Sequence, residues 1–179
     1  MARILPGSDA PNIAQMAYAG RLLDRAGLTG MESIVAAGAG FLLAVLWFDL
    51  MFDVQVLRHT DGDVPEPVLA SIAGYYRRVT TEARPMNRLV VVVMLGTLLA
   101  IVLQVIREDA PRWVSAVSAV AAVAPIGLAA VHTVPSAVRL GARRDPVAMQ
   151  STLARSICRD HLFSIGSIAT LLVVQLIWA

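Results

Sequence analysis

The chain has 179 residues, of which 57% are hydrophobic and only 16% charged, and 15 basic against 13 acidic residues leave a net charge of +2. Soluble domains carry roughly a quarter charged residues and about 45 to 50% apolar ones, so the composition argues against a water-soluble domain. Every basic residue is Arg, and these residues flank apolar segments instead of forming a soluble basic stripe. We therefore expect a protein of the lipid bilayer and no nucleic-acid partner.

The N-terminal region predicts a short amphipathic helix over about 12–27, where Ile13, Met16, Ala17 and Leu23 recur at helical spacing. A similar pattern between the first two apolar segments predicts a second such helix over about 65–84, in which Tyr75 and Tyr76 suit a membrane interface. Both helices are expected to lie in the plane of the interface.

Four segments are apolar enough to cross a bilayer, which takes about 20 residues. They cover about 33–57, 89–106, 113–138 and 162–178. Such segments must satisfy their backbone groups internally, so they are predicted to be helices. Asp145 and Pro146 form a helix-start pair, so the fourth helix is expected to begin near residue 146. The whole chain, 1–179, is predicted to be one all-α, polytopic membrane four-helix bundle with short interfacial amphipathic helices.

The orientation of the bundle follows from its Arg residues. The connections 58–88 and 139–159 hold five Arg each, and the opposite side holds the other five. The positive-inside rule then places both connections in the cytosol and both termini outside, in a cell membrane. Trp113 and Trp178 are expected at the outer interface, and Gln104 and Gln175 are expected to bond across helices on that side.

Three ionisable side chains fall inside the predicted spans: Asp49, Asp53 and His132. Charged groups in hydrocarbon cost at least roughly 2.5 to 3.5 kcal/mol, so they mark candidate functional sites. Asp49 and Asp53 share one helix face. At 1.5 Å per residue, His132 lies about 10 Å from Arg139, near the depth of Asp49. His161 enters the membrane at the same end. Pro135 cannot donate a hydrogen bond to the carbonyl of Val131, and a free carbonyl at this depth is tolerated beside a cavity, so the cytosolic half of the third helix is predicted to line one.

Three interpretations of this polar layer remain open. In the first, the two Asp residues pair with Arg84, Arg88 or Arg139 and lock the bundle. In the second, Asp49 orients His132 in a cavity that binds a ligand or shuttles a proton. In the third, the polar residues bind a metal ion. The metal set is Asp49, Asp53, His132 and His161. The candidate ligand-binding residues are Asp49, Asp53, Asn87, Arg88, His132, Arg139 and His161.

The four spans, Asn87 at the entrance to the second and the stretch Arg155-Ser-Ile-Cys-Arg-Asp-His161 before the fourth resemble the anthrone-oxygenase-like family of small four-helix bacterial membrane proteins. The resemblance implies a bacterial inner-membrane protein with functional roles for Asn87, Arg155 and His161.

Three functions are consistent with the sequence. The first is a ligand-binding or oxidoreductase-like protein whose cytosolic cavity takes a small ligand, a quinone or a metal, with Arg88 or Arg139 attracting an anionic or quinone-like molecule. The second is a structural or accessory subunit of a larger membrane complex, whose polar layer only holds helices together. The third is a small transporter acting as a homodimer, for which the small residues around Gly38 offer a contact surface.

Overall fold

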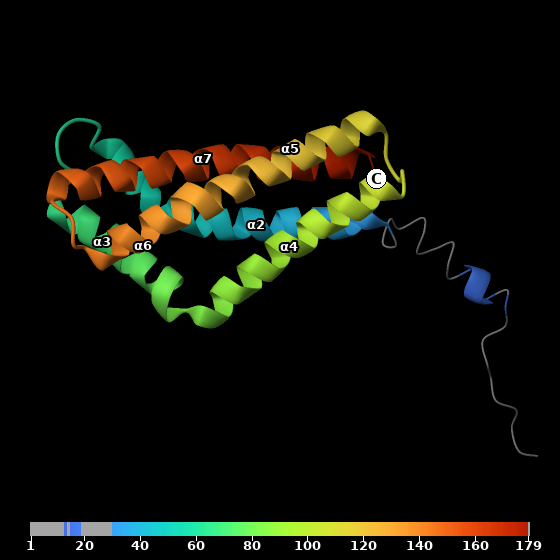
Figure 1. Ribbon diagram of the computed structural model, residues 1–179, viewed down its shortest axis with the longest axis horizontal. Helices are drawn as coiled ribbons and strands as arrows, with labels where there is room; N and C mark the ends of the chain where they lie inside the picture. The colour runs from blue at the N-terminus through green and yellow to red at the C-terminus, as the bar shows by residue number, and fades with distance from the viewer. Residues whose placement is uncertain (1–12, 14, 19–29, 179) are drawn as a thin grey trace, which may run out of the picture.

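The computed structural model describes residues 13, 15–18 and 30–178 (Figure 1). Within residues 30–178 every regular element is helical. In chain order these elements are α2 (Met31–Asp53), the 3₁₀ turn η1 (Val54–Arg58), α3 (Glu66–Arg77), the π-helical turn η2 (Arg78–Glu82), α4 (Arg84–Ile106), α5 (Arg112–Leu128), the π-helical turn η3 (Ala129–Thr133), α6 (Val134–Ala142) and α7 (Val147–Trp178).

Four helical stretches are long and apolar enough to cross a membrane: Met31–Arg58, Pro85–Ile106, Arg112–Ala142 and Val147–Trp178. They pack as a bundle, which confirms the predicted all-α membrane architecture. α7 begins at Val147, next to the predicted start. α3 and η2 together cover most of the predicted helix at 65–84. Residues 13 and 15–18 are helical, but the rest of the helix predicted over 12–27 lies outside the described residues.

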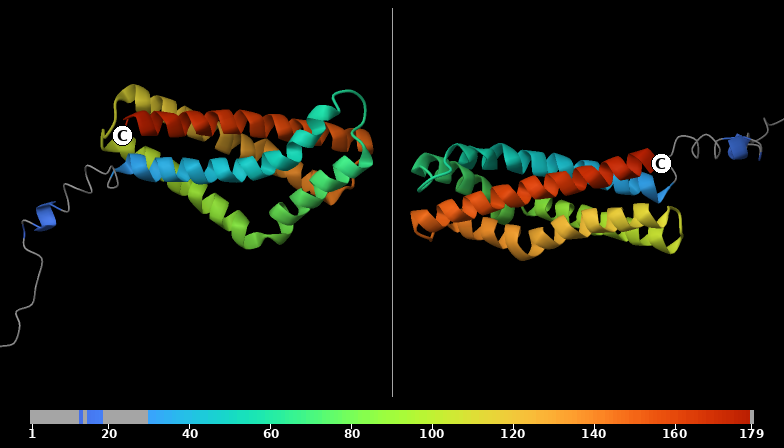
Figure 2. Two further views of the ribbon diagram at one scale, coloured as in Figure 1. Left: turned by 180° about the vertical axis from the view of Figure 1, so that it is seen from behind. Right: turned by 90° about the horizontal axis from the view of Figure 1, so that it is seen from above.

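The helices run up and down the bundle in turn, and α7 packs against both α2 and α5 (Figures 1 and 2). α4 packs against α2 and α5 near the connection 107–111 but diverges from the other helices towards its own start, where α3, η2 and α4 form a V. The pairing of α3 with α6 closes the bundle at that end. A cavity lies beside the divergent start of α4, and residues of α2 and α7 also line it.

The third span contains two prolines but remains one continuous helical path. Pro125 lies inside α5 and Pro135 lies at the start of α6, with η3 between them. Because proline has no N–H, the helical hydrogen bonding must be rearranged around it. The predicted break at Pro135 is therefore a widened π-helical turn, a feature that often accompanies functional sites.

Two apolar clusters stabilise the bundle, one at each end. The first surrounds Leu69, Ile72 and Leu140, and the second surrounds Val35, Ile168 and Leu171. Along α2 and α7, Asp53 and His161 fall between the two clusters. Gly38, considered above as part of a dimer contact, packs inside the chain instead, because a Cβ there would collide with the Thr97 side chain of α4.

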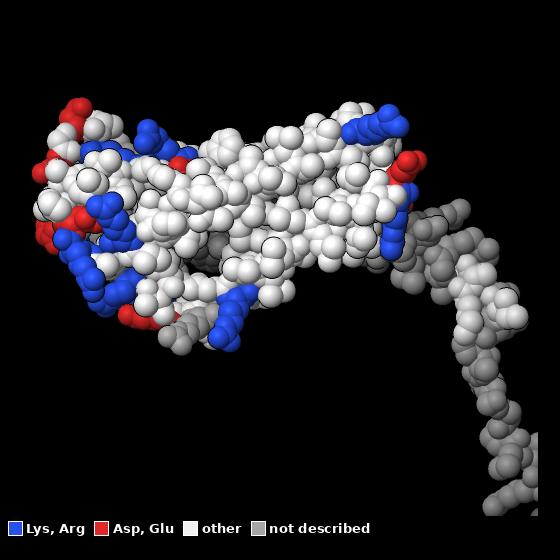
Figure 3. Space-filling view, in the orientation of Figure 1, with Lys and Arg blue, Asp and Glu red and all other residues white. Residues whose placement is uncertain are grey.

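On the face seen in Figure 3, charged side chains gather at the two ends of the molecule and at the start of α4, and the rest of the surface is almost uncharged. Thirty-three large hydrophobic side chains are exposed in the described part of the chain, including Trp47, Val92 and Leu176. Soluble monomers do not expose apolar surface on this scale. The distribution is that of a multi-pass protein whose apolar band contacts lipid.

Candidate functional site

Asp53 is the centre of a buried hydrogen-bond network that joins three helices. Its side chain has 0% exposure, and Oδ2 lies 2.6 Å from Nδ1 of His161 on α7. Its other oxygen, Oδ1, accepts a 2.6 Å hydrogen bond from the hydroxyl of Tyr76 on α3. An ionised carboxylate can only accept, so Nδ1 of His161 carries the hydrogen of the first bond. Asp53 thereby fixes the orientation of the imidazole ring.

Asp49 lies one turn before Asp53 and makes the equivalent bond to the neighbouring tyrosine. The Tyr75 hydroxyl donates to Asp49 Oδ1 at 2.6 Å. Burial raises the pKa of both Tyr75 and Tyr76, and the adjacent carboxylates raise them further. The two phenols therefore keep their protons, which both point at Asp side chains. Asp49 Oδ2 lies 3.9 Å from Nε2 of His161, beyond hydrogen-bond distance.

These groups form the polar end of a cavity of about 560 Å³ within the bundle. Asp49, Tyr75, Tyr76 and His161 line it, whereas Asp53 stands behind them. The rest of the wall is mostly apolar and comes from α2, α4, α7 and the third span, with Leu42, Val45, Leu46, Val90, Met94, Pro125, Ile126, Ala129, Val134, Ala137 and Ile168 among its members. The prediction that the third helix lines a cavity is confirmed. A hollow beside the start of α4 is visible in Figure 3.

His132 does not belong to this polar end, and the expectation that Asp49 orients it is wrong. Its Nδ1 lies 2.6 Å from Asp160 Oδ2, and its side chain is 46% exposed. Asp160 Oδ2 also accepts a hydrogen bond from Thr133 at 2.9 Å. The rise per residue predicts one depth for His132 and Asp49, but depth does not determine the direction in which a side chain points from its helix. The π-helical turn at η3 changes the angular spacing further, and His132 faces outward.

The arginines expected at the site also lie elsewhere. Arg139 makes a two-point ion pair with Asp145, through Nε and Nη2 at 2.8 Å each. The Arg139 guanidinium lowers the pKa of Asp145, chiefly by hydrogen bonding. Arg88 is exposed, and neither Arg88 nor Arg139 lines the cavity. The side chain of Arg84 lies outside what the structure describes.

Of the residues implied by the family resemblance, Asn87 and His161 line the cavity and Arg155 does not. Asn87 donates through Nδ2 to the carbonyl of Thr80 at 3.0 Å, which ties the start of α4 to η2. Arg155 donates to the backbone carbonyls of His59 and Gly62 and so fixes the 59–63 loop against α7.

The proposed metal set does not assemble. Because His132 pairs with Asp160, only Asp49, Asp53 and His161 remain together. Among the described residues, no group of three or more His, Cys, Asp or Glu side chains is placed to hold a metal ion. Asp53 already uses both oxygens, on Tyr76 and His161.

Tyr75 and Tyr76 belong to the site, a role that the sequence pattern of a membrane-interface helix did not predict. A signal was present for Tyr76, which continues the spacing of Leu69 and Ile72 on the buried face of α3. No comparable signal exists for Asp160, because its role depends on where α7 meets η3. Both tyrosines contact Asp residues more than 20 positions away in the chain.

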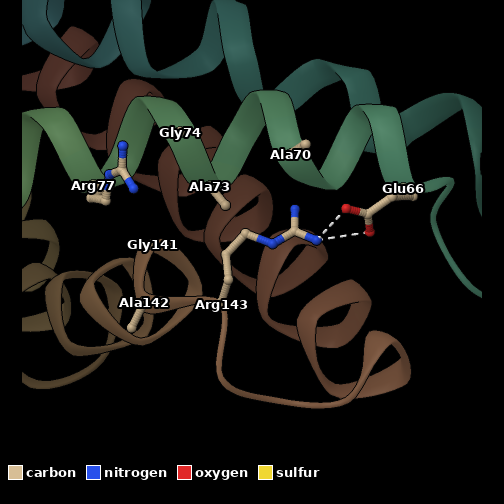
Figure 4. Close-up of a pocket in the computed structure, with 8 residues that line it drawn as sticks. All are labelled: Glu66, Ala70, Ala73, Gly74, Arg77, Gly141, Ala142 and Arg143. Carbon is tan, nitrogen blue, oxygen red and sulfur yellow. Dashed lines mark hydrogen bonds and ion pairs between the residues drawn. The ribbon is translucent and has the colours of Figure 1, made fainter.

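A second hollow of about 440 Å³ lies between α3 and α6 at the outside of the same end (Figure 4). Arg143 ends α6 in the left-handed conformation, with φ 52°, and its Nη2 donates to both carboxylate oxygens of Glu66. The two helices approach closely because Gly141 has no side chain: a Cβ there would lie 2.9 Å from the backbone nitrogen of Arg77. This hollow therefore belongs to the contact that holds α3 in place.

The chain was compared with protein-family models, curated proteins and solved structures, and none of them matches it.

Proposed function

We propose that this protein binds a small, mostly apolar molecule inside the membrane, in the cavity bounded by Asp49, Tyr75, Tyr76 and His161. The observation that carries the proposal is the cavity itself, about 560 Å³ in volume, with polar groups gathered at one end of an apolar wall. Binding sites for small molecules have this composition and this range of volume. The apolar part would hold the body of the ligand, and the polar end would orient it.

The route to the cavity supports a lipid-soluble ligand. Four of the residues that line it are also exposed on the outside of the bundle: Phe48, Met86, Val91 and Val134. They lie beside the divergent start of α4, within the apolar segments that contact lipid. A molecule dissolved in the bilayer can therefore enter sideways between helices.

The polar end also has the chemistry to exchange a proton with a ligand. Asp53 holds His161 through Nδ1, so Nε2 is the nitrogen that remains for a ligand in the cavity. A histidine fixed in this way by a carboxylate is a general base of the usual kind. This supports an enzymatic extension of the binding role, the oxidoreductase-like function considered from the sequence.

A pair of neighbouring alanines in η3 tests the binding role. Ala129 lines the cavity, whereas Ala130 is exposed and does not. The probe is 4-phenylbutan-1-ol, titrated calorimetrically into protein in an uncharged detergent. We expect saturable binding to the wild type and to Ala130→Phe. Ala129→Phe should show only unsaturable partitioning into micelles, because the ring intrudes into the part of the cavity where the body of the probe lies. Equal saturable binding to both variants, or none to the wild type, contradicts the proposal.

A structural or accessory role is the second candidate, and the buried network favours it. Asp53 joins α2, α3 and α7 through two hydrogen bonds, and its side chain has no contact with solvent. Asp49→Asn separates the two roles. If the layer only holds helices together, the substitution should lower the melting temperature in detergent, and adding the probe should not change the melting temperature of either protein. If the layer serves a ligand, the melting temperature should hold while binding changes.

We further propose that the end bearing Asp53 faces the cytosol and that both termini lie outside, on the strength of the ten Arg residues counted at that end against five at the other. Thr60 and Asp109 are exposed in connections at opposite ends of the bundle. A membrane-impermeant maleimide applied to intact cells should label Asp109→Cys and spare Thr60→Cys. The reverse pattern would invert the orientation.

A further inference from the structure

The polar end of the cavity is acidic, and no described cation compensates it. When both are ionised, Asp49 and Asp53 place two negative charges beside one imidazole, His161, so one negative charge remains even when that ring is protonated. The chain has no Lys, and no Arg whose side chain the structure describes lines the cavity. Buried charges are normally paired, because transfer out of water is costly for an unpaired ion. With both carboxylates ionised, the described residues leave the site short of one positive charge when the His161 ring is protonated and of two when it is neutral.

The same end presents acceptors and almost no donors. The hydroxyl hydrogens of Tyr75 and Tyr76 are given to Asp49 and Asp53. His161 gives its Nδ1 hydrogen to Asp53, so in the neutral ring Nε2 is an acceptor. The His161 side chain is only 9% exposed, and Nε2 makes no hydrogen bond to any described residue. The donors left along the wall are the Ser164 hydroxyl and the second Asn87 N–H.

Two of these acceptors are placed to share one donor atom. Asp49 Oδ2 and His161 Nε2 lie 3.9 Å apart, too far to bond each other. A nitrogen between them can lie about 2.8 Å from both, the usual length of a charge-assisted hydrogen bond. A hydroxyl group has one hydrogen and can satisfy only one of the two. A protonated amine has two or three hydrogens and also carries a positive charge, which compensates one of the two carboxylates.

We propose that the cavity selects a lipophilic amine in its protonated form, with the ammonium nitrogen bridging Asp49 and His161 and the apolar body lying against α4 and the third span. The proposal rests on the proposed function, since it names the ligand class of that same cavity. Phe52 and Tyr75 stack with ring centroids 4.1 Å apart and line the same end of the cavity, where aromatic rings add to the attraction for a cation. The anionic ligand expected from Arg88 and Arg139 is disfavoured, because neither guanidinium reaches the site.

The test compares two probes of nearly the same size and shape, 4-phenylbutylamine and 4-phenylbutan-1-ol, in protein held in uncharged detergent at pH 7. We expect the amine to bind the wild type at least tenfold more tightly than the alcohol. Asp49→Asn should reduce this preference to within about twofold. Asp61→Asn removes a carboxylate from an exposed loop at the same end and should leave the preference unchanged.

Two further measurements keep the outcomes separate. In Ala129→Phe, which retains both carboxylates, saturable binding of both probes should be lost. The trimethylammonium analogue of the amine carries the charge without N–H groups, and it should bind more weakly than the amine. If the alcohol and the amine bind equally well and Ala129→Phe removes both, the cavity is a binding site but the amine selectivity is wrong. If neither probe binds the wild type, the proposed function itself fails.

Discussion

The two ends of the bundle both bury polar side chains, but they use them differently. Near the connection 107–111, Gln104 and Gln175 exchange hydrogen bonds of 3.3 and 3.2 Å, and Gln175 also donates to Ser118 at 2.8 Å. Trp113 and Trp178 meet edge to face just beyond, with ring centroids 6.2 Å apart. The two hydrogen bonds between the amides confirm the predicted contact between Gln104 and Gln175. The amide layer is neutral and its amides pair with each other.

At the other end the buried groups are ionisable, and their bonds are unevenly shared. Asp53 has both oxygens bonded, whereas His161 Nε2 and Asp49 Oδ2 face each other without bonding. Buried polarity alone therefore does not mark a site, since the amide layer has it too. The distinguishing features are ionisable side chains, an acceptor without a donor and an adjoining cavity.

The ionisable groups Asp49, Asp53 and His161, with Tyr75 and Tyr76, form the charged layer. The largest effect should follow from removing Asp53, at its centre. Asp53→Ala leaves the Tyr76 hydroxyl and His161 Nδ1 buried without an acceptor, and breaking a buried pair in this way costs about 3 to 5 kcal/mol. We expect a marked fall in the melting temperature in detergent, or failure to fold. Asp61→Asn on the exposed loop serves as the control. An unchanged melting temperature for Asp53→Ala would show that the charged layer contributes no more than surface charge.

The close contact of α3 with α6 positions Tyr75 and Tyr76, so it too can be tested. Gly141→Ala places a Cβ 2.9 Å from the backbone nitrogen of Arg77, and overpacking of this kind costs about 1 to 3 kcal/mol. Gly74→Ala, in the same hollow, meets no atom within 4 Å and is the matched control. We expect the first variant to melt at a lower temperature and the second to melt at or above the wild-type value. Equal behaviour would mean that α3 can shift freely.

The amide layer should be less sensitive. Gln175→Leu leaves Gln104 and Ser118 without their partner, and side-chain hydrogen bonds in membranes contribute about 0.6 kcal/mol on average, with a maximum of about 1.7. The double variant Gln104→Leu, Gln175→Leu should recover part of the loss, because it removes both halves of the pair. A loss as large as that of Asp53→Ala would erase the contrast between the two ends.

The smallest expected effect concerns the exposed ion pair between Arg139 and Asp145. The pKa of Asp145 is lowered in the folded protein, so its contribution to stability is present above its ordinary pKa near 3.8 and is lost as the pH falls through the lowered value. We expect Asp145→Asn to melt slightly below the wild type at pH 7, since solvent screens such pairs. The difference should shrink as the pH falls below about 3.8 and disappear once Asp145 is protonated in the folded protein as well. A difference that grows with acidification would contradict this assignment.

Much of the candidate site could be predicted because it depends on local spacing. Asp49 and Asp53 share a helix face at any position of the helix, and His161 enters its span from the same end of the bundle. The pairing of Asp53 with His161 could not be predicted, because it depends on how α2 and α7 are rotated about their axes. His132 illustrates the same point. The rise per residue predicts that it lies at the depth of Asp49, but helix packing turns its side chain towards Asp160.

The sequence by itself determined that the protein is a bundle of four membrane helices, because hydrocarbon requires long apolar segments whose backbone groups are satisfied internally. It also determined that ten of the 15 Arg residues, together with Asp49, Asp53 and His161, collect towards one end. Only the tertiary structure decided which of those charges meet, because helix rotation, the π-helical turn at η3 and the divergence of α4 result from side-chain packing between distant segments. The cavity depends on the same packing, because it lies where α4 diverges from α2 and α7. Its presence therefore cannot be predicted from any single segment of the sequence.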